Sequence, residues 1–186
     1  MRKIVLLIAI LGISCLSFSQ EKKQSFVFGM NDMQPNILAY SPKIGFQVGY
    51  ASEKPFSEAF SFQKEVYFSV KSFDYHEPKS VLNLKNTTYA LEVPLSVKWY
   101  KPKFFKPYIG VAGIWNFNSK TEYYVANTDN VSIGNLEFAV LGGVHVPLIQ
   151  NLGFDVSFMG TPVFGDRQSI TYHGWRLSLK YSFAKD

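Results

Sequence analysis

The chain has 186 residues, of which 47% are hydrophobic and 18% are charged. This balance excludes a disordered chain and a coiled coil, and the length suggests a single domain. The 17 Phe, 11 Tyr, 3 Trp and 13 Gly favour β-structure over a helical enzyme, and the single Cys excludes an intramolecular disulfide.

The first 19 residues have the pattern of a secretory signal peptide. Two basic residues, Arg2 and Lys3, precede an apolar run at residues 4–13, and small residues follow at positions 17 and 19. An apolar run of about ten residues is too short to cross a bilayer as a helix. We therefore predict a signal peptide at residues 1–19 and one domain at residues 20–186.

Two further features of this segment affect the interpretation. Cys15 lies just after the apolar run, where a Cys can be acylated, so a lipoprotein signal is the alternative. Cleavage after residue 19 removes two of the 19 cations and no anion, which leaves 17 cations against 14 anions and a net charge of +3. A charge this small on an exported chain predicts no binding of nucleic acid.

Alternation of apolar and polar residues runs through the rest of the chain. It is clearest at residues 88–100, where six successive odd positions are apolar: Tyr89, Leu91, Val93, Leu95, Val97 and Trp99. Three other segments alternate in the same way, residues 60–73, 153–159 and 173–183, and four do so more weakly, residues 26–28, 44–50, 108–117 and 136–146. A period of two predicts a β-strand, so we predict eight strands, and no segment has a convincing helical period.

The connections between these segments alternate in length. Long connections are expected at residues 30–42, 74–86, 118–133 and 160–169, and short, turn-like ones at residues 52–59, 101–106 and 147–151. Long loops at one end and tight turns at the other are typical of outer-membrane β-barrels, for which eight is the smallest usual strand number. The sequence therefore predicts an all-β fold: an eight-stranded antiparallel up-and-down transmembrane β-barrel in the bacterial outer membrane, with its short turns in the periplasm.

The polar face of the strands distinguishes two architectures. In a membrane barrel this face lines the lumen, whereas in a soluble barrel or sandwich it is the solvated outer face. The membrane interpretation places four charges of each sign in the lumen, where unpaired ions are costly: Glu65, Glu92, Glu137, Asp155, Lys71, Lys98, Arg176 and Lys180. We expect one antiparallel register to pair Glu92 with Lys71 and Lys98 with Glu65, as a structural lock.

One strand carries a resemblance to a known family. The segment YALEVPLSVKWY resembles the Y-L-E-I-P-L-L-x-K-Y strand of the small porin-family outer-membrane barrels, the PorT-like group, through Glu92, Pro94, Leu95 and Lys98. The segments KPYIGVAG and WRLSLKYSF are similar to other strands of that group. The resemblance implies an eight-stranded barrel surrounded by outer-membrane lipid and inserted by the barrel-insertion machinery, and it implies no catalytic residue.

Candidate chemistry is limited to three histidines. His76 lies with two acids in a predicted loop, a set able to hold a metal but more typical of solvated surface. His173 is expected at the membrane interface, and His145 is expected in the lumen beside Glu137. We therefore predict no catalytic residue, no metal and no cofactor. A rim enzyme that modifies lipid or cleaves protein is the least favoured function.

The width of the predicted barrel also bears on function. Eight strands enclose a lumen only wide enough for side chains, so the inward charges would fill it. We predict a non-enzymatic barrel that stabilises the envelope or contacts an unknown protein partner through its long loops, where Tyr123 and Tyr124 are candidate contact residues. The alternative is a narrow channel or an accessory of transport or secretion.

Overall fold

The computed structural model describes residues 23–35, 40–76, 83–123, 129–131, 135–161 and 172–183. These residues form nine strands: β1 (Lys23–Pro35), β2 (Tyr40–Pro55), β3 (Phe60–His76), β4 (Asn83–Trp99), β5 (Lys106–Tyr123), β6 (Asp129–Val131), β7 (Asn135–Ile149), β8 (Leu152–Gly160) and β9 (Tyr172–Phe183). In this part of the chain, no helix is long and apolar enough to cross a membrane. The predicted signal peptide and Cys15 lie outside the described residues.

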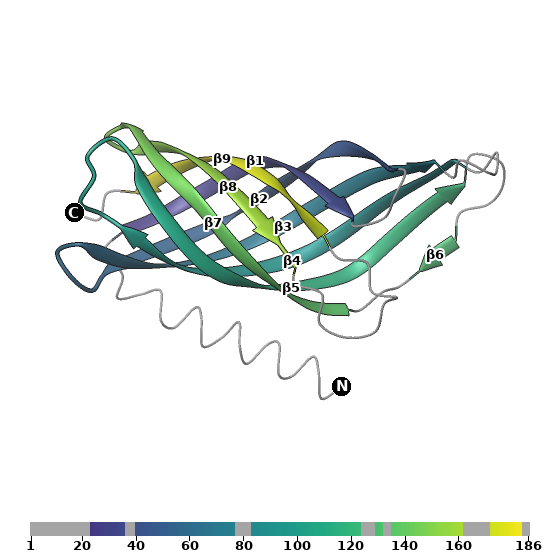
Figure 1. Cartoon of the computed structure of the whole chain (residues 1–186), viewed down its shortest axis with the longest axis horizontal. Helices are drawn as coiled ribbons and strands as arrows, with labels where there is room; N and C mark the ends of the chain where they lie inside the picture. Colours follow the sequence, from purple (N-terminus) through teal and green to yellow (C-terminus); the bar gives the residue numbers. More distant parts are fainter. Residues whose placement is uncertain are drawn as a thin grey trace.

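The strands close into a barrel (Figure 1). Each long strand pairs antiparallel with the next along the chain, with β5 pairing β7, and β9 returns to pair with β1. The short β6 adds to one edge of β5 beyond the point where β7 ends its pairing. Within the described residues the barrel itself therefore has eight strands, and the predicted fold is confirmed.

The two ends of the barrel differ. One end, here the short-turn end, carries the connections at residues 56–59, 100–105 and 150–151, together with the first residue of β1 and the last of β9 (Figure 1, left). The opposite end, here the extended end, carries β6 and the tips of β3, β4 and β5. The alternation of connection lengths in the sequence thus corresponds to a physical asymmetry of the barrel.

The predicted long loops were wrong in extent. Most of residues 30–42, 74–86 and 118–133 belong to strands, because β3 continues to His76, β4 begins at Asn83 and β5 continues to Tyr123. The remainder of these segments, and most of residues 160–169, lie outside the described residues. The strand ends escaped prediction because the regular alternation of apolar and polar residues used to recognise strands is lost in the sequence there, as in residues 83–88 and 118–123.

Strand β4 shows which face of the sheet lines the lumen. Its even-numbered residues from Thr88 to Lys98 are buried inside the barrel, and its odd-numbered residues from Tyr89 to Trp99 face outward. All eight long strands expose large apolar side chains on the outside, among them Phe26, Phe46, Phe68, Leu95, Ile109, Phe138, Phe158 and Leu177. A polar inside with an apolar outside reverses the pattern of a soluble barrel and is that of a transmembrane one.

Aromatic side chains form two bands on this outer surface. At the short-turn end, the ring centroids of Phe26 and Phe183 are 4.9 Å apart. Toward the extended end, the ring of Phe68 lies 6.3 Å from Tyr89 and 6.1 Å from Phe117. Bands of rings at two heights are the aromatic girdles that flank the apolar belt of membrane barrels.

The spacing of the bands matches the thickness of a membrane. On β4, Trp99 belongs to the short-turn band and Tyr89 to the other, ten residues earlier in the strand. Ten residues span about 33 Å along a strand, or about 25 Å along the barrel axis at a tilt of about 40°. This is the height of the apolar belt of an outer-membrane barrel, so the tips of β3, β4 and β5 project beyond it.

Candidate functional site

Glycines on the inner face make room for the rings of the lumen. A Cβ atom at Gly49 would lie 2.5 Å from the ring of Tyr67, its cross-strand partner. A Cβ atom at Gly143 would lie 2.6 Å from the ring of Tyr108, also its cross-strand partner. Each ring therefore occupies the space that a side chain at the facing glycine would fill. This leaves the centre of the lumen to the charged side chains.

The central cluster is built around one carboxylate, that of Glu92, which has no solvent exposure. Lys71 Nζ lies 2.9 Å from Glu92 Oε1, and Ser69 Oγ donates a hydrogen bond to the same oxygen at 2.7 Å. The guanidinium group of Arg176 contacts Glu92 Oε2 and lies 5.6 Å from the ring of Tyr67. The buried carboxylate of Glu92 is thus shared by two buried cations, Lys71 of β3 and Arg176 of β9.

Glu137 supplies a second acid near this cluster. It is half-buried on the inner face of β7 and accepts a hydrogen bond from Asn116 Nδ2 at 2.7 Å. His145 lies in the lumen as expected, but its side chain contacts Asp155 and not Glu137, beside which it was expected. His145 and Asp155 are direct cross-strand partners on β7 and β8, which brings them together.

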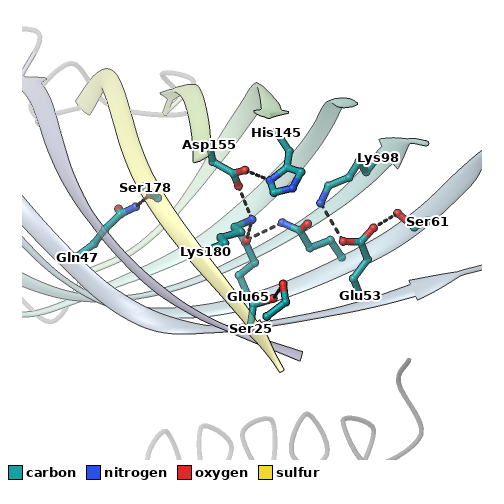
Figure 2. Close-up of polar contacts among 12 residues, drawn as sticks. Ser25, Gln47, Glu53, Ser61, Glu65, Lys98, His145, Asp155, Ser178 and Lys180 are labelled. Carbon is teal, nitrogen blue, oxygen red and sulfur yellow. Dashed lines mark hydrogen bonds and ion pairs between the residues drawn. The ribbon is translucent and has the colours of Figure 1, made fainter. Parts of the chain in front are cut away.

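The mouth cluster lies nearer the short-turn end and is centred on Lys180 (Figure 2). Lys180 Nζ lies 2.5 Å from Glu65 Oε1 and also contacts Asp155 Oδ2, so it bridges two carboxylates. Asp155 in turn contacts His145 Nδ1 through its other oxygen. Gln63 Nε2 donates to Glu65 Oε1 at 2.5 Å. These contacts connect side chains of β3, β7, β8 and β9 across the lumen.

Lys98 belongs to the mouth cluster but does not bind the predicted partner. Its Nζ lies 2.9 Å from Oε2 of Glu53 (Figure 2). The other oxygen of Glu53, Oε1, accepts a hydrogen bond from Ser61 Oγ at 2.6 Å. The expected pair of Lys98 with Glu65 is therefore wrong, since Glu65 binds Lys180. Glu53 was missed because the segment that contains it, residues 52–59, was interpreted as a turn, whereas β2 continues to Pro55.

The observed register makes both predicted pairs diagonal, and only one of them forms. Glu92 is directly opposite Tyr67, four residues from Lys71, and Lys98 is directly opposite Ser61, four residues from Glu65. Both expected pairs are thus diagonal rather than direct. The side chain of Lys71 is long enough to reach Glu92 along the diagonal. Lys98 instead binds Glu53, a carboxylate from β2.

The rest of the described lumen contains an apolar cluster and one small cavity. Apolar side chains on the inner face form one buried cluster, with the members Met33, Phe73, Ala90, Tyr108, Ala112, Ile114, Ala139, Leu141 and Met159. At the short-turn end a cavity of about 10 Å³ adjoins Glu53, Lys98, His145 and Lys180. A cavity of this size holds about one water molecule.

Comparison with known proteins identifies the family. Residues 11–160 match the family model described as outer membrane protein beta-barrel domain. The chain belongs to this family. It is therefore a bacterial outer-membrane protein, and the predicted location and family are confirmed at this level. The finer resemblance to the PorT-like group stays a prediction.

Solved structures of low sequence identity share the fold. Ail, the attachment invasion locus protein of Yersinia pestis, is 15% identical and has a TM-score of 0.54, over 88% of this chain and 100% of that chain. A major outer membrane protein from Thermus thermophilus is 16% identical and has a TM-score of 0.54, over 87% of this chain and 98% of that chain. No curated protein matches the sequence of this chain.

The structure places the other candidate residues of this family member near the extended end, on the separate strands β3, β5 and β9. His76 ends β3 at the extended end, and His173 faces outward on β9, 6.5 Å from the ring of Phe158. Tyr123 ends β5 opposite Leu84, whereas Tyr124 lies outside the described residues. No group of three potential metal ligands occurs among the residues that the structure describes.

Gly153 provides a test of how tightly the mouth cluster is packed. A Cβ atom added there would overlap Cε1 of His145, so we expect Gly153→Ala to displace the ring and destabilise the barrel by about 1–3 kcal/mol. Gly113→Ala is the matched control, because nothing lies within 4 Å of its Cβ position. Urea unfolding in phospholipid vesicles measures both. Equal stability of the two variants would contradict the packing described here.

Proposed function

We propose that this outer-membrane barrel is not an enzyme, that its lumen is closed, and that it contacts a protein partner at its extended end. The supporting observation is the projection of β3, β4 and β5 beyond the aromatic band nearer that end. The parts of β3, β4 and β5 that rise above the membrane present a polar surface to the outside. Paired strands are rigid, and rigid elements position contacts better than loops do. The projection thus supports a partner-contacting role.

The outward face of the projection has the chemistry of a surface in water. Lys43 Nζ on β2 lies 2.6 Å from Asp74 Oδ2 on β3. Next to this pair, Ser72 Oγ lies 3.4 Å from Thr87 Oγ1 on β4. An ion pair and hydroxyl groups facing outward would be costly in lipid. They therefore support a projection that stands in solvent, where a protein can reach it.

A closed lumen is supported by its contents. The central cluster, the mouth cluster and the apolar cluster together occupy the lumen within the described part of the chain. Opening a path for ions would require breaking contacts of buried charges, each worth several kcal/mol. The narrow channel is therefore the second candidate. Recordings of single-channel conductance in planar bilayers distinguish the two, and we expect no discrete conductance steps.

Photocrosslinking in intact cells tests the partner directly. A photoreactive residue introduced at Thr87, on the projection, should capture a protein. The same residue introduced at Val97, which faces outward within the apolar belt of the same strand, should not. A shortened hairpin that joins Ser72 to Thr87 by a two-residue turn keeps their observed pairing and should lose the crosslinked protein. No protein at Thr87, or the same proteins at both positions, would contradict the proposal.

The orientation of the barrel gives a separate prediction. The sequence predicts that protease added to intact cells cuts, if anywhere, near Lys120 or Arg167 and spares Lys101 and Lys103, which lie in a short turn. Because Lys120 lies within β5 and pairs with Thr87 and Asn130, we expect Arg167 to be the site that is cut if the extended end faces outward. The physical reason is that short turns and chain ends of such barrels face the periplasm. Mass spectrometry of the released peptides identifies the cut sites. Cleavage at Lys101 and Lys103 alone would reverse the orientation.

A further inference from the structure

Two neighbouring turns at the short-turn end expose rings beside lysines. In the turn between β2 and β3, Phe56 is 61% exposed next to the exposed Lys54. In the turn between β4 and β5, Phe104 is 84% exposed and the adjacent Phe105 is also exposed. We call the surface formed by Lys54, Phe56, Lys101, Lys103, Phe104 and Phe105 the basic rim.

The two turns are held together, so the basic rim is one continuous surface. Tyr100 N donates a hydrogen bond to Ala59 O at 2.7 Å, from the second turn to the first. Ser57 Oγ accepts hydrogen bonds from the backbone of Ala59 at 3.2 Å and of Phe60 at 3.0 Å, which fixes the first turn. Burial and the nearby Glu53 carboxylate raise the pKa of Tyr100 to about 12, so its hydroxyl stays neutral. Lys106 Nζ lies over the ring of Tyr100, 3.6 Å from the ring centroid.

The charge of the basic rim is unbalanced. Lys54, Lys101 and Lys103 are exposed, and Glu58 is the single acid in residues 54–59 and 100–106, all of which the structure describes. The lumen acids do not compensate, because Glu53 is buried against Lys98. An excess of exposed cations favours an anionic partner.

The height of the basic rim indicates which anion it meets. Phe60 and Trp99 are direct cross-strand partners in the short-turn aromatic band, where rings lie at the level of lipid headgroups. The basic rim follows directly on that band, with Lys101 only two residues after Trp99. Exposed phenylalanines flanked by lysines are the composition of protein surfaces that lie in the interface of anionic membranes.

We propose that the basic rim binds the phosphate groups of anionic phospholipids in the leaflet around the short-turn end. Lys54, Lys101 and Lys103 bind the headgroup phosphates, and Phe56, Phe104 and Phe105 enter the interface between them. The rim thus anchors the barrel at a fixed depth and enriches acidic lipid around one end. This binding does not depend on the proposed partner or on the orientation of the barrel.

Tryptophan fluorescence in lipid nanodiscs tests the binding. The three tryptophans are Trp99 at the short-turn band and, nearer the extended end, Trp115 and Trp175. A variant with Trp115→Phe and Trp175→Phe reports from Trp99 alone, and a variant with Trp99→Phe and Trp175→Phe reports from Trp115 alone. Quenching by brominated phosphatidylglycerol, compared with brominated phosphatidylcholine, gives the relative affinity for the acidic lipid at each end.

We expect phosphatidylglycerol to be preferred at Trp99 and not at Trp115. Lys101→Gln with Lys103→Gln should lower the preference at Trp99 by up to about fivefold per lysine at low salt, and salt should lower it further. The matched control Lys85→Gln, on the outward face of β4 near the extended end, should leave the Trp99 signal unchanged. Heat-dependent gel mobility verifies that each variant is folded.

Three outcomes would overturn the proposal. The first is equal quenching of Trp99 by the two lipids. The second is a preference that survives the loss of both lysines. The third is loss of the preference when inorganic phosphate replaces chloride at constant ionic strength, because that result assigns the rim to free phosphate rather than to lipid.

Discussion

Glu92→Ala should destabilise the barrel by about 3–5 kcal/mol, because it leaves two buried cations without their common carboxylate. Lys71 and Arg176 both contact Glu92 in the central cluster, and each is at most 4% exposed. We expect the loss as a lower midpoint of urea unfolding in phospholipid vesicles and as a lower temperature of the gel-mobility shift. Water that reaches the cluster would reduce the loss.

Further substitutions separate pairing from packing. Glu92→Ala with Lys71→Ala should recover part of the loss, since only Arg176 then lacks the carboxylate. Glu92→Leu with Lys71→Met and Arg176→Met should recover more, because apolar groups of similar size need no counterion. Ser69→Ala is the matched control: it removes one hydrogen bond to Glu92 and leaves the charges intact. If the double variant is no more stable than additivity predicts, Lys71 and Glu92 are not coupled.

The fold could be predicted from the sequence because one strand repeats its pattern without interruption. In β4 every outward position from Tyr89 to Trp99 is apolar, and the inward Glu92 and Lys98 mark the other face. This pattern specifies which face is buried, whatever the register of the neighbouring strand. It disappears in the projecting tips, where the outward residues Ser72 and Thr87 are polar.

The pairing of charges could not be predicted to the same degree, because it depends on register and on the length of side chains. Alternation places Lys98 of β4 inside the barrel. It does not reveal that Lys98 binds Glu53 of β2, two strands away, and not Glu65 of the adjacent β3. Glycines would have provided a signal. Gly153 lies where the ring of His145 needs space, which indicates that these two residues are neighbours on adjacent strands.

The role of the lumen charges as a structural lock stays a prediction, and Lys180 is its most informative residue. Lys180 contacts the carboxylates of Glu65 and Asp155 within the mouth cluster and is 3% exposed. Lys180→Met keeps most of the side-chain volume but leaves two acids close together with no permanent cation between them. The expected loss again reaches about 3–5 kcal/mol, since a repulsion between like charges adds to the unpaired burial.

Lys98→Met is the matched control for this substitution. Comparing the two variants tests whether Lys180 stabilises the barrel by bridging two carboxylates. Lys98→Met removes a similarly buried lysine from the same cluster but leaves only Glu53 without its cation, and Glu53 keeps the hydroxyl of Ser61 as a donor. We therefore expect Lys180→Met to lower the free energy of unfolding by more than Lys98→Met does. Adding Asp155→Asn should restore part of the loss in Lys180→Met, and acidification should lessen it, because a protonated carboxyl carries no charge. Equal losses in the two lysine variants, unaffected by acid, would mean that Lys180 contributes through packing alone.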